Sequence, residues 1–150
     1  QKRWVIITME HSVTKGLVAA VFTPFTYDSH ELDLQKVKVQ AEFLKKQGVK
    51  TVVVAGTTGE SLKLSVKERM LLVEEWVRVA PKYDITCIVH VGHNCVQDAV
   101  ELAKHAEKLC VAGIIAMSTS FFQPLAVSDL VKTMDVIANG APKTPFFYYH

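Results

Sequence analysis

The sequence predicts an α/β fold in which parallel strands alternate with helices. From residue 16 onward, short runs rich in β-branched residues alternate with longer segments whose apolar residues recur at helical spacing. Each strand and its helix together take about 30 residues, as in a βαβ unit. No Gly/Ser linker or block of like charge interrupts the series. We therefore expect parallel strands joined by right-handed crossovers over residues 16–150, preceded by an N-terminal extension, residues 1–15, to which no structure is assigned.

Two architectures use this alternation: the doubly wound open sheet and the (β/α)8 TIM barrel. The length of 150 residues matches one ordinary domain, whereas a complete barrel typically needs ~250 residues. On the barrel interpretation, the chain covers about the first four βα units plus strand 5. The alternation alone leaves both architectures open.

The first βα unit occupies residues 16–48. Residues 16–22 form a continuous apolar run that Thr23-Pro24 ends, which predicts a strand buried on both faces. Apolar residues at helical spacing over 34–44 predict a helix that Gly48 closes. Residues 51–55 then predict the second strand.

Two helix starts carry recognisable caps. The segment Ser65-Val66-Lys67-Glu68 matches a capping box and opens the second helix. Residues 86–91 predict the third strand. Asn94 is the expected cap of a third helix that ends at Leu109, with Gln97 as its reciprocal partner.

The last unit follows the same pattern. Residues 112–117 predict the fourth strand, and the spacing of Leu130, Met134 and Ile137 predicts a helix that ends at Gly140. The apolar aromatic run over 145–149 predicts a fifth strand.

Composition excludes several classes of protein. Seventeen Lys and Arg residues against fifteen Asp and Glu residues give a formal charge of +2, too even for a dedicated nucleic-acid or membrane-surface binder. No segment approaches the ~20 apolar residues of a membrane-spanning helix. The three cysteines, Cys87, Cys95 and Cys110, are an odd set at unrelated spacings, which favours reduced thiols in a cytoplasmic protein.

Functional residues of both architectures gather where the strands end. Hydroxyl side chains dominate these positions. His90 and His93 lack a third ligand nearby, so we expect no metal. The GxGxxG and GxxxxGK[ST] nucleotide-binding patterns are absent. The strand-end positions are Thr23, 57–60, 90–93, 118–120 and 149–150.

The segment Gly56-Thr57-Thr58-Gly59-Glu60 is the most informative. Two adjacent hydroxyls on a glycine-flanked backbone offer converging hydrogen-bond donors, which suits a small carboxylate or another oxyanion. Thr57 and Glu60 also have the spacing of a capping box, which would make the same segment a helix start. The residues alone favour neither interpretation.

Several aromatic side chains have two interpretations each. The phenol of Tyr149, at the end of an apolar strand, can relay a proton or simply pack. We expect His90 and His93 to be hydrogen-bonded structural residues rather than bases. Phe121-Phe122 suits a hydrophobic cover over a pocket or an interface anchor.

Three segments resemble the dihydrodipicolinate synthase/N-acetylneuraminate lyase family. They are Gly16-Leu17-Val18-Ala19-Ala20 with Thr23-Pro24, then residues 56–60, then Tyr148-Tyr149-His150, in the family's order and spacing. Residues 88–92 and Phe121-Phe122-Gln123-Pro124 resemble the lyase branch more than the synthases.

The resemblance implies a partial (β/α)8 barrel of a class I aldolase that acts on pyruvate. It implies that Thr57 and Thr58 bind the pyruvyl carboxylate, that Tyr149 shuttles a proton during carbon–carbon cleavage, and that no cofactor is needed. The lyase branch cleaves N-acetylneuraminate to pyruvate and N-acetylmannosamine, commonly as a homotetramer. Its Schiff-base lysine belongs to strand 6, so we expect none of the fourteen lysines here to be the nucleophile.

Three alternatives remain. The chain can be a catalytically inactive half-barrel that acts as an interaction or regulatory partner, a dihydrodipicolinate synthase-like pyruvate enzyme, or a flavodoxin-like domain that holds a phosphate at Thr57 and Thr58. A half-barrel leaves its inner face uncovered, and we expect that face to carry apolar side chains. The candidates are Val52, Val54, Ile88 and Ile114.

Overall fold

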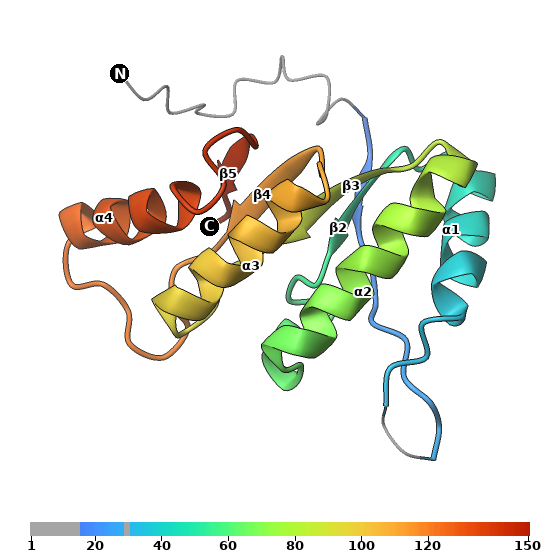
Figure 1. Ribbon diagram of the computed structural model, residues 1–150, viewed down its shortest axis with the longest axis horizontal. Helices are drawn as coiled ribbons and strands as arrows, with labels where there is room; N and C mark the ends of the chain where they lie inside the picture. Colours follow the sequence, from blue (N-terminus) through green and yellow to red (C-terminus); the bar gives the residue numbers. More distant parts are fainter. Residues whose placement is uncertain (1–15, 29–30) are drawn as a thin grey trace.

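A five-stranded parallel sheet forms the centre of the chain (Figure 1). The computed structural model describes residues 16–28 and 31–150, so the predicted extension 1–15 lies outside the described residues. The strands lie side by side in chain order, as in a barrel, and not in the reordered sequence of a doubly wound sheet. The flavodoxin-like alternative is therefore wrong. The strands are β1 (Val18–Ala20), β2 (Thr51–Val54), β3 (Thr86–His90), β4 (Gly113–Ala116) and β5 (Phe146–Tyr148).

One helix follows each of the first four strands, which confirms the predicted alternation. Figure 1 shows these helices along one side of the curved sheet. Two short 3-10 helices, which the spacing of apolar residues did not predict, lie before and after the second α-helix. The helices are α1 (Lys36–Lys46), η2 (Ser61–Lys63), α2 (Val66–Val79), η3 (Ala80–Tyr83), α3 (Val96–Lys108) and α4 (Val127–Ala138).

Local chemistry sets two of the helix ends as predicted and one differently. The Ser65 hydroxyl accepts from the Glu68 amide at 3.2 Å while the Glu68 carboxylate accepts from the Ser65 amide at 2.8 Å, so the capping box is confirmed. Gly48 follows α1 at φ 75°, in the left-handed region that glycine adopts readily. The predicted cap at Asn94 is wrong. Helix α3 begins after Cys95 without a side-chain cap, because Asn94 is engaged elsewhere.

The core fills the space between the sheet and the helices. Trp76 of α2 is fully buried there, together with Val52, Val54 and Ile114. These three strand residues therefore face the helices, and their assignment to the inner face is wrong. Because side chains alternate along a strand, the residues next to these three in their strands occupy the opposite face of the sheet. Ile88 lies outside this core cluster, so its assignment to the inner face stands.

Strand β1 is not buried on both faces as predicted. It is an edge of the sheet, its own residues are half-buried or exposed, and the flanking residues Leu17 and Phe22 are each 68% exposed. A continuous apolar run indicates a strand covered on two sides, but β1 lies at an edge of the sheet, where the described residues cover it only in part.

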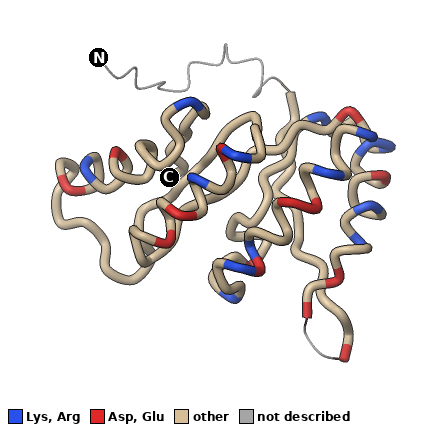
Figure 2. The backbone as a smooth tube through the Cα atoms, in the orientation of Figure 1, with Lys and Arg blue, Asp and Glu red and all other residues tan. Residues whose placement is uncertain are grey.

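Charges of both signs are interspersed along the helices and turns, and the five strands carry none (Figure 2). This distribution agrees with the near-balanced composition, and residues 16–28 and 31–150 show no basic stripe of the kind that binds nucleic acid. Among the described residues, no helix is long and apolar enough to cross a membrane.

Candidate functional site

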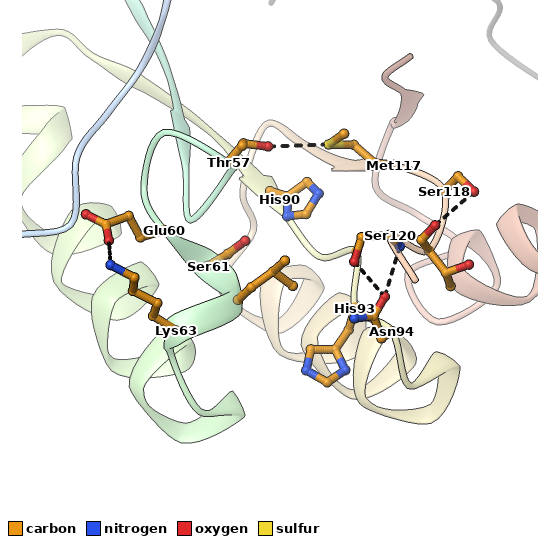
Figure 3. Close-up of a pocket in the computed structure, with 13 residues that line it drawn as sticks. Thr57, Glu60, Ser61, Lys63, His90, His93, Asn94, Met117, Ser118 and Ser120 are labelled. Atoms are coloured by element: carbon orange, nitrogen blue, oxygen red, sulfur yellow. Dashed lines mark hydrogen bonds and ion pairs between the residues drawn. The ribbon is translucent and has the colours of Figure 1, made fainter. Parts of the chain in front are cut away.

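A pocket of about 320 Å³ opens at the carboxyl ends of β2, β3 and β4 (Figure 3). Three loops line it, one from each strand end, and most of the lining side chains are hydroxyl, amide or imidazole groups. This is the edge of the sheet where both candidate architectures collect functional residues. The lining residues are Thr57, Glu60, Ser61, Leu62, Lys63, His90, Gly92, His93, Asn94, Met117, Ser118, Thr119 and Ser120.

Residues 56–60, which we call the GTTGE loop, form a turn and not a helix cap. The Glu60 amide donates to the Thr57 carbonyl at 3.0 Å, and the Ser61 amide donates to the Gly56 carbonyl at 3.2 Å. The Glu60 carboxylate pairs with the Lys63 ammonium at 2.5 Å instead of reaching back to Thr57. The helix-start alternative is therefore wrong, since η2 begins after Glu60 without a side-chain cap.

The loop offers hydrogen-bond donors to a ligand. In the part of the chain that the structure describes, the amides of Thr57, Thr58 and Gly59 donate to no protein acceptor. The loop is close-packed on its other side, because a Cβ on Gly59 would lie 3.1 Å from the Val21 carbonyl. Glycine thus permits the close approach to Val21, the residue after β1, that holds these amides at the sheet edge.

The two threonines occupy different positions. Thr57 lines the pocket, and its hydroxyl lies 3.5 Å from the sulfur of Met117, across the pocket mouth (Figure 3). Thr58 is exposed on the same turn and is not among the lining residues. The structure therefore brings one of the two predicted anchors into the pocket and leaves the other beside it.

Tyr149 lies at the same edge of the sheet, outside the pocket. Its amide donates to the Ala116 carbonyl at 3.0 Å, which sets the residue beside the end of β4 and next to Met117. The residue is 58% exposed. The Tyr148 hydroxyl, by contrast, lies 3.4 Å from Nδ1 of His150.

Both predicted structural histidines are hydrogen-bonded and also line the pocket. His90 Nδ1 lies 3.1 Å from the Ala55 carbonyl, and His93 Nδ1 accepts from the Cys95 amide at 3.0 Å. Burial, together with the neighbouring Arg69 guanidinium, lowers the pKa of His90 to about 4, although the bond to Ala55 opposes the shift. A neutral imidazole at this position is not a general acid at physiological pH.

Several residues at or near the pocket were not predicted. Arg69 of α2 is fully buried beneath it, and burial lowers the pKa of its guanidinium to about 10. The sequence did hold a signal for its burial, because Arg69 is a charged residue within the apolar stripe that Leu72, Val73 and Trp76 form on α2. Asn94 accepts from the Ser120 amide and hydroxyl at 2.9 and 3.0 Å, which joins two of the pocket loops.

A known protein family covers almost the whole chain. The family model described as the dihydrodipicolinate synthetase family matches residues 13–150. The chain belongs to this family. The resemblance seen in the three sequence segments is confirmed, and the sheet with its helices is the α/β arrangement of the TIM-barrel enzymes in this family.

Curated relatives of this dihydrodipicolinate synthetase family chain include N-acetylneuraminate lyases. The Xenopus tropicalis lyase is 42% identical over 137 residues, and the Homo sapiens lyase is 39% identical over the same length. These alignments cover 91% of the chain and 45% and 42% of the two relatives. The chain therefore spans less than half the length of the curated relatives it matches.

Solved structures agree with the sequence comparison. The N-acetylneuraminate lyase of Proteus mirabilis superposes with a TM-score of 0.86 at 37% identity, over 90% of this family member and 45% of that chain. A catalytic-lysine mutant of the Ruminococcus gnavus sialic acid aldolase superposes with a TM-score of 0.82 at 31% identity, over 89% of this family member and 43% of that chain. The dihydrodipicolinate synthase of Aquifex aeolicus superposes with a TM-score of 0.82 at 27% identity, over 90% of this family member and 44% of that chain.

Proposed function

We propose that residues 16–150 form part of a class I aldolase that cleaves N-acetylneuraminate to pyruvate and N-acetylmannosamine. The observation that carries the proposal is the GTTGE loop, whose unpartnered amides and Thr57 hydroxyl lie at the mouth of a hydroxyl-rich pocket. Identity supports a lyase rather than a synthase, since it is 37% to the Proteus mirabilis lyase and 27% to the Aquifex aeolicus synthase.

In this proposal the GTTGE loop holds the carboxylate of the pyruvyl group. The hydroxyls of Thr57 and Thr58 and the free amides of the loop donate to its two oxygens. Hydrogen bonds to a charged acceptor contribute about 1.5–3 kcal/mol each, and donors fixed on a rigid turn need no reorganisation when the ligand arrives. The exposure of Thr58 is compatible with contact to a ligand that extends beyond the pocket wall.

Tyr149 is the proposed proton relay. A lysine amine attacks the keto carbon of the substrate, and water leaves as the imine forms. When the carbon–carbon bond breaks, its electron pair moves into the imine to give an enamine, and Tyr149 takes the proton of the hydroxyl that becomes the aldehyde. Protonation of the enamine and hydrolysis of the imine then release pyruvate and regenerate the amine. The backbone bond from Tyr149 to Ala116 supports this role, because it holds the Tyr149 backbone at the edge of the sheet that carries Thr57.

The nucleophile of this proposal lies outside residues 1–150. An imine-forming lysine needs a desolvated amine. Lys63 is the lysine that lines the pocket, but its side chain is 75% exposed and paired with Glu60. Lys50 and Lys143 precede β2 and β5 and therefore lie at the other end of the sheet.

Borohydride trapping with labelled pyruvate tests the assignment of the nucleophile. We expect no covalent label on the 150-residue chain. We expect label when these residues are joined to the segment of the Xenopus tropicalis lyase that the chain does not match. Label on Lys63 or another lysine of the 150 residues would contradict the proposal. No label in the joined protein either would favour the inactive half-barrel.

Two substitutions in the joined protein test the residue roles. Thr58→Val should raise the KM for substrate about tenfold with a smaller change in kcat, as expected for a lost bond to a charged group. Tyr149→Phe should lower kcat by about 100-fold or more with little change in KM. Thr133→Val on α4 and Tyr27→Phe, an exposed residue, are the matched controls. Control-like behaviour of Thr58→Val or Tyr149→Phe would remove that residue from the site.

We also propose a homotetramer located in the cytoplasm. Phe121 and Phe122 are 78% and 82% exposed, and their rings pack edge to face with 4.9 Å between the ring centres. An exposed aromatic pair of this kind supports a subunit contact. The unpaired thiols of Cys87, Cys95 and Cys110 support a reducing compartment. Sedimentation equilibrium of the joined protein tests the tetramer, and a Phe121→Ser, Phe122→Ser variant should dissociate it.

A further inference from the structure

A buried polar network lies directly beneath the GTTGE loop. The guanidinium of Arg69, on α2, donates to the Gly92 carbonyl at 2.9 Å and to the His90 carbonyl at 2.6 Å. These are two backbone acceptors just at the end of β3. Arg69 and His90 are 0% and 8% exposed, so water does not compete for these bonds. The end of β3 is thereby fixed against α2.

The partners of His90 determine which of its nitrogens carries the proton. Nδ1 lies 3.1 Å from the Ala55 carbonyl, which can only accept, so this bond requires hydrogen on Nδ1. The Nη2 nitrogen of Arg69, which donates to the His90 carbonyl at 2.6 Å, lies 3.4 Å from Nδ1, so the contact of Nδ1 with the Ala55 carbonyl is the shorter of the two. His90 therefore donates from Nδ1 to Ala55.

Ala55 occupies the hinge between β2 and the GTTGE loop. Its φ of 56° places a non-glycine residue in the left-handed region, which costs about 1–2 kcal/mol. Such a conformation persists where the surroundings hold it. The hydrogen bond from His90 holds the Ala55 carbonyl, and the peptide that begins there leads directly into Gly56. At the other end of the loop, the Thr23 hydroxyl donates to the Gly59 carbonyl at 2.5 Å.

From these contacts we infer that His90 is a positioning residue that orients the GTTGE loop for its ligand through the Ala55 carbonyl. It touches the loop's backbone and not the carboxylate. The identity of the ligand, a pyruvyl carboxylate, rests on the proposed function. The effect of His90 on the conformation of the loop does not depend on that function. Loss of the Nδ1 donor releases the Ala55 hinge while the β2–β3 ladder remains paired.

Three variants separate this role from simple packing. His90→Asn keeps a side-chain amide near the position of Nδ1 and so a donor for Ala55. His90→Gln moves the amide one carbon farther out, and His90→Leu removes it. Thr23→Val releases the other end of the loop and is the matched comparison, because it leaves His90 intact.

Amide hydrogen exchange in the ligand-free 150-residue chain is the first measurement. In His90→Leu and His90→Gln, the Glu60 and Ser61 amides, which bond within the loop, should exchange about tenfold faster than in wild type, as expected for a lost hydrogen bond. The amide of Val53 in β2 should not change, and His90→Asn should behave as wild type. Unchanged loop exchange in the Leu and Gln variants would overturn the inference, as would equal acceleration of loop and strand amides.

Titration of the same variants with pyruvate, followed by amide chemical shifts, is the second measurement. His90→Leu should weaken pyruvate binding about tenfold, and His90→Asn should restore it. Normal affinity in His90→Leu beside weakened binding in Thr58→Val would overturn the inference and leave the proposed function standing. If wild type binds no pyruvate while the exchange pattern holds, the carboxylate assignment fails and His90 remains the residue that orients the loop.

Discussion

Acidification should destabilise the folded chain through His90. The pKa of the imidazole is 6.5 in the unfolded chain and about 4 in the folded chain. Between these values the unfolded state binds a proton that the folded state does not. The free energy contributed by the neutral, buried imidazole is therefore fully present above pH 6.5 and falls as the pH falls through about 4.

The size of this effect follows from the two pKa values. Each pKa unit corresponds to about 1.4 kcal/mol, so a shift of this size is equivalent to about 3 kcal/mol when titration is complete. The linkage relation assigns about 2 kcal/mol of that to the interval between pH 7 and pH 5. Domains of ordinary stability have about 5–15 kcal/mol in total, so the loss is large enough to measure.

Urea unfolding at pH 7 and pH 5 measures it. Wild type should lose about 2 kcal/mol more than His90→Asn, which keeps a donor for Ala55 but cannot bind the proton. His105→Asn is the control, because His105 pairs with Glu74 at the surface and leaves His90 in place. That control should therefore keep the excess loss. Equal losses in wild type and His90→Asn would refute the assignment of the pH dependence to His90.

Three further predictions concern stability and reactivity. Gly113→Ala should lower the free energy of unfolding by about 1–3 kcal/mol, because its Cβ would lie 2.5 Å from the Phe147 ring; the additional change Phe147→Leu, compared by urea unfolding, should recover part of the loss. Ser65→Ala should lower it by about 1 kcal/mol through loss of the capping box, and an unchanged urea midpoint would argue against the cap. Burial raises the pKa of Cys87 to about 12, so iodoacetamide at pH 8 should modify the exposed Cys110 roughly 100-fold faster, as mass spectrometry of the peptides can measure.

Most of the fold could be predicted because strands and helices leave periodic patterns. All five strands and four α-helices of the described residues overlap the ranges that apolar runs, helical spacing and capping patterns predicted. The error at Asn94 has a long-range cause, since its side-chain oxygen accepts from Ser120 in another loop and no local pattern contains that partner. The exposure of β1 depends on which other segments cover the sheet. The residues of a single strand do not indicate those segments.

The site was partly predictable for the same reason. Strand ends pointed to Thr57 and to residues 118–120, and the pocket contains them. The sequence did not indicate that Thr58 lies outside the pocket wall, because neighbouring residues on a turn point in different directions. For Arg69 the sequence showed a charged residue within an apolar helix stripe, but not its partners, which are the backbone carbonyls of His90 and Gly92 at the end of β3 and just after it.

The chain-order arrangement of the strands has a consequence for synthesis on the ribosome. Each strand pairs with the strand that precedes it, at a separation of about 25–35 residues between partners, as Val18 with Thr51 and Ile114 with Phe146 illustrate. When a strand emerges from the ribosome, the strand with which it pairs has already been translated. No strand of this sheet therefore needs a later strand before it can pair with the existing sheet. The sheet can therefore be extended from the amino end, one βα unit at a time, while the chain is being synthesised.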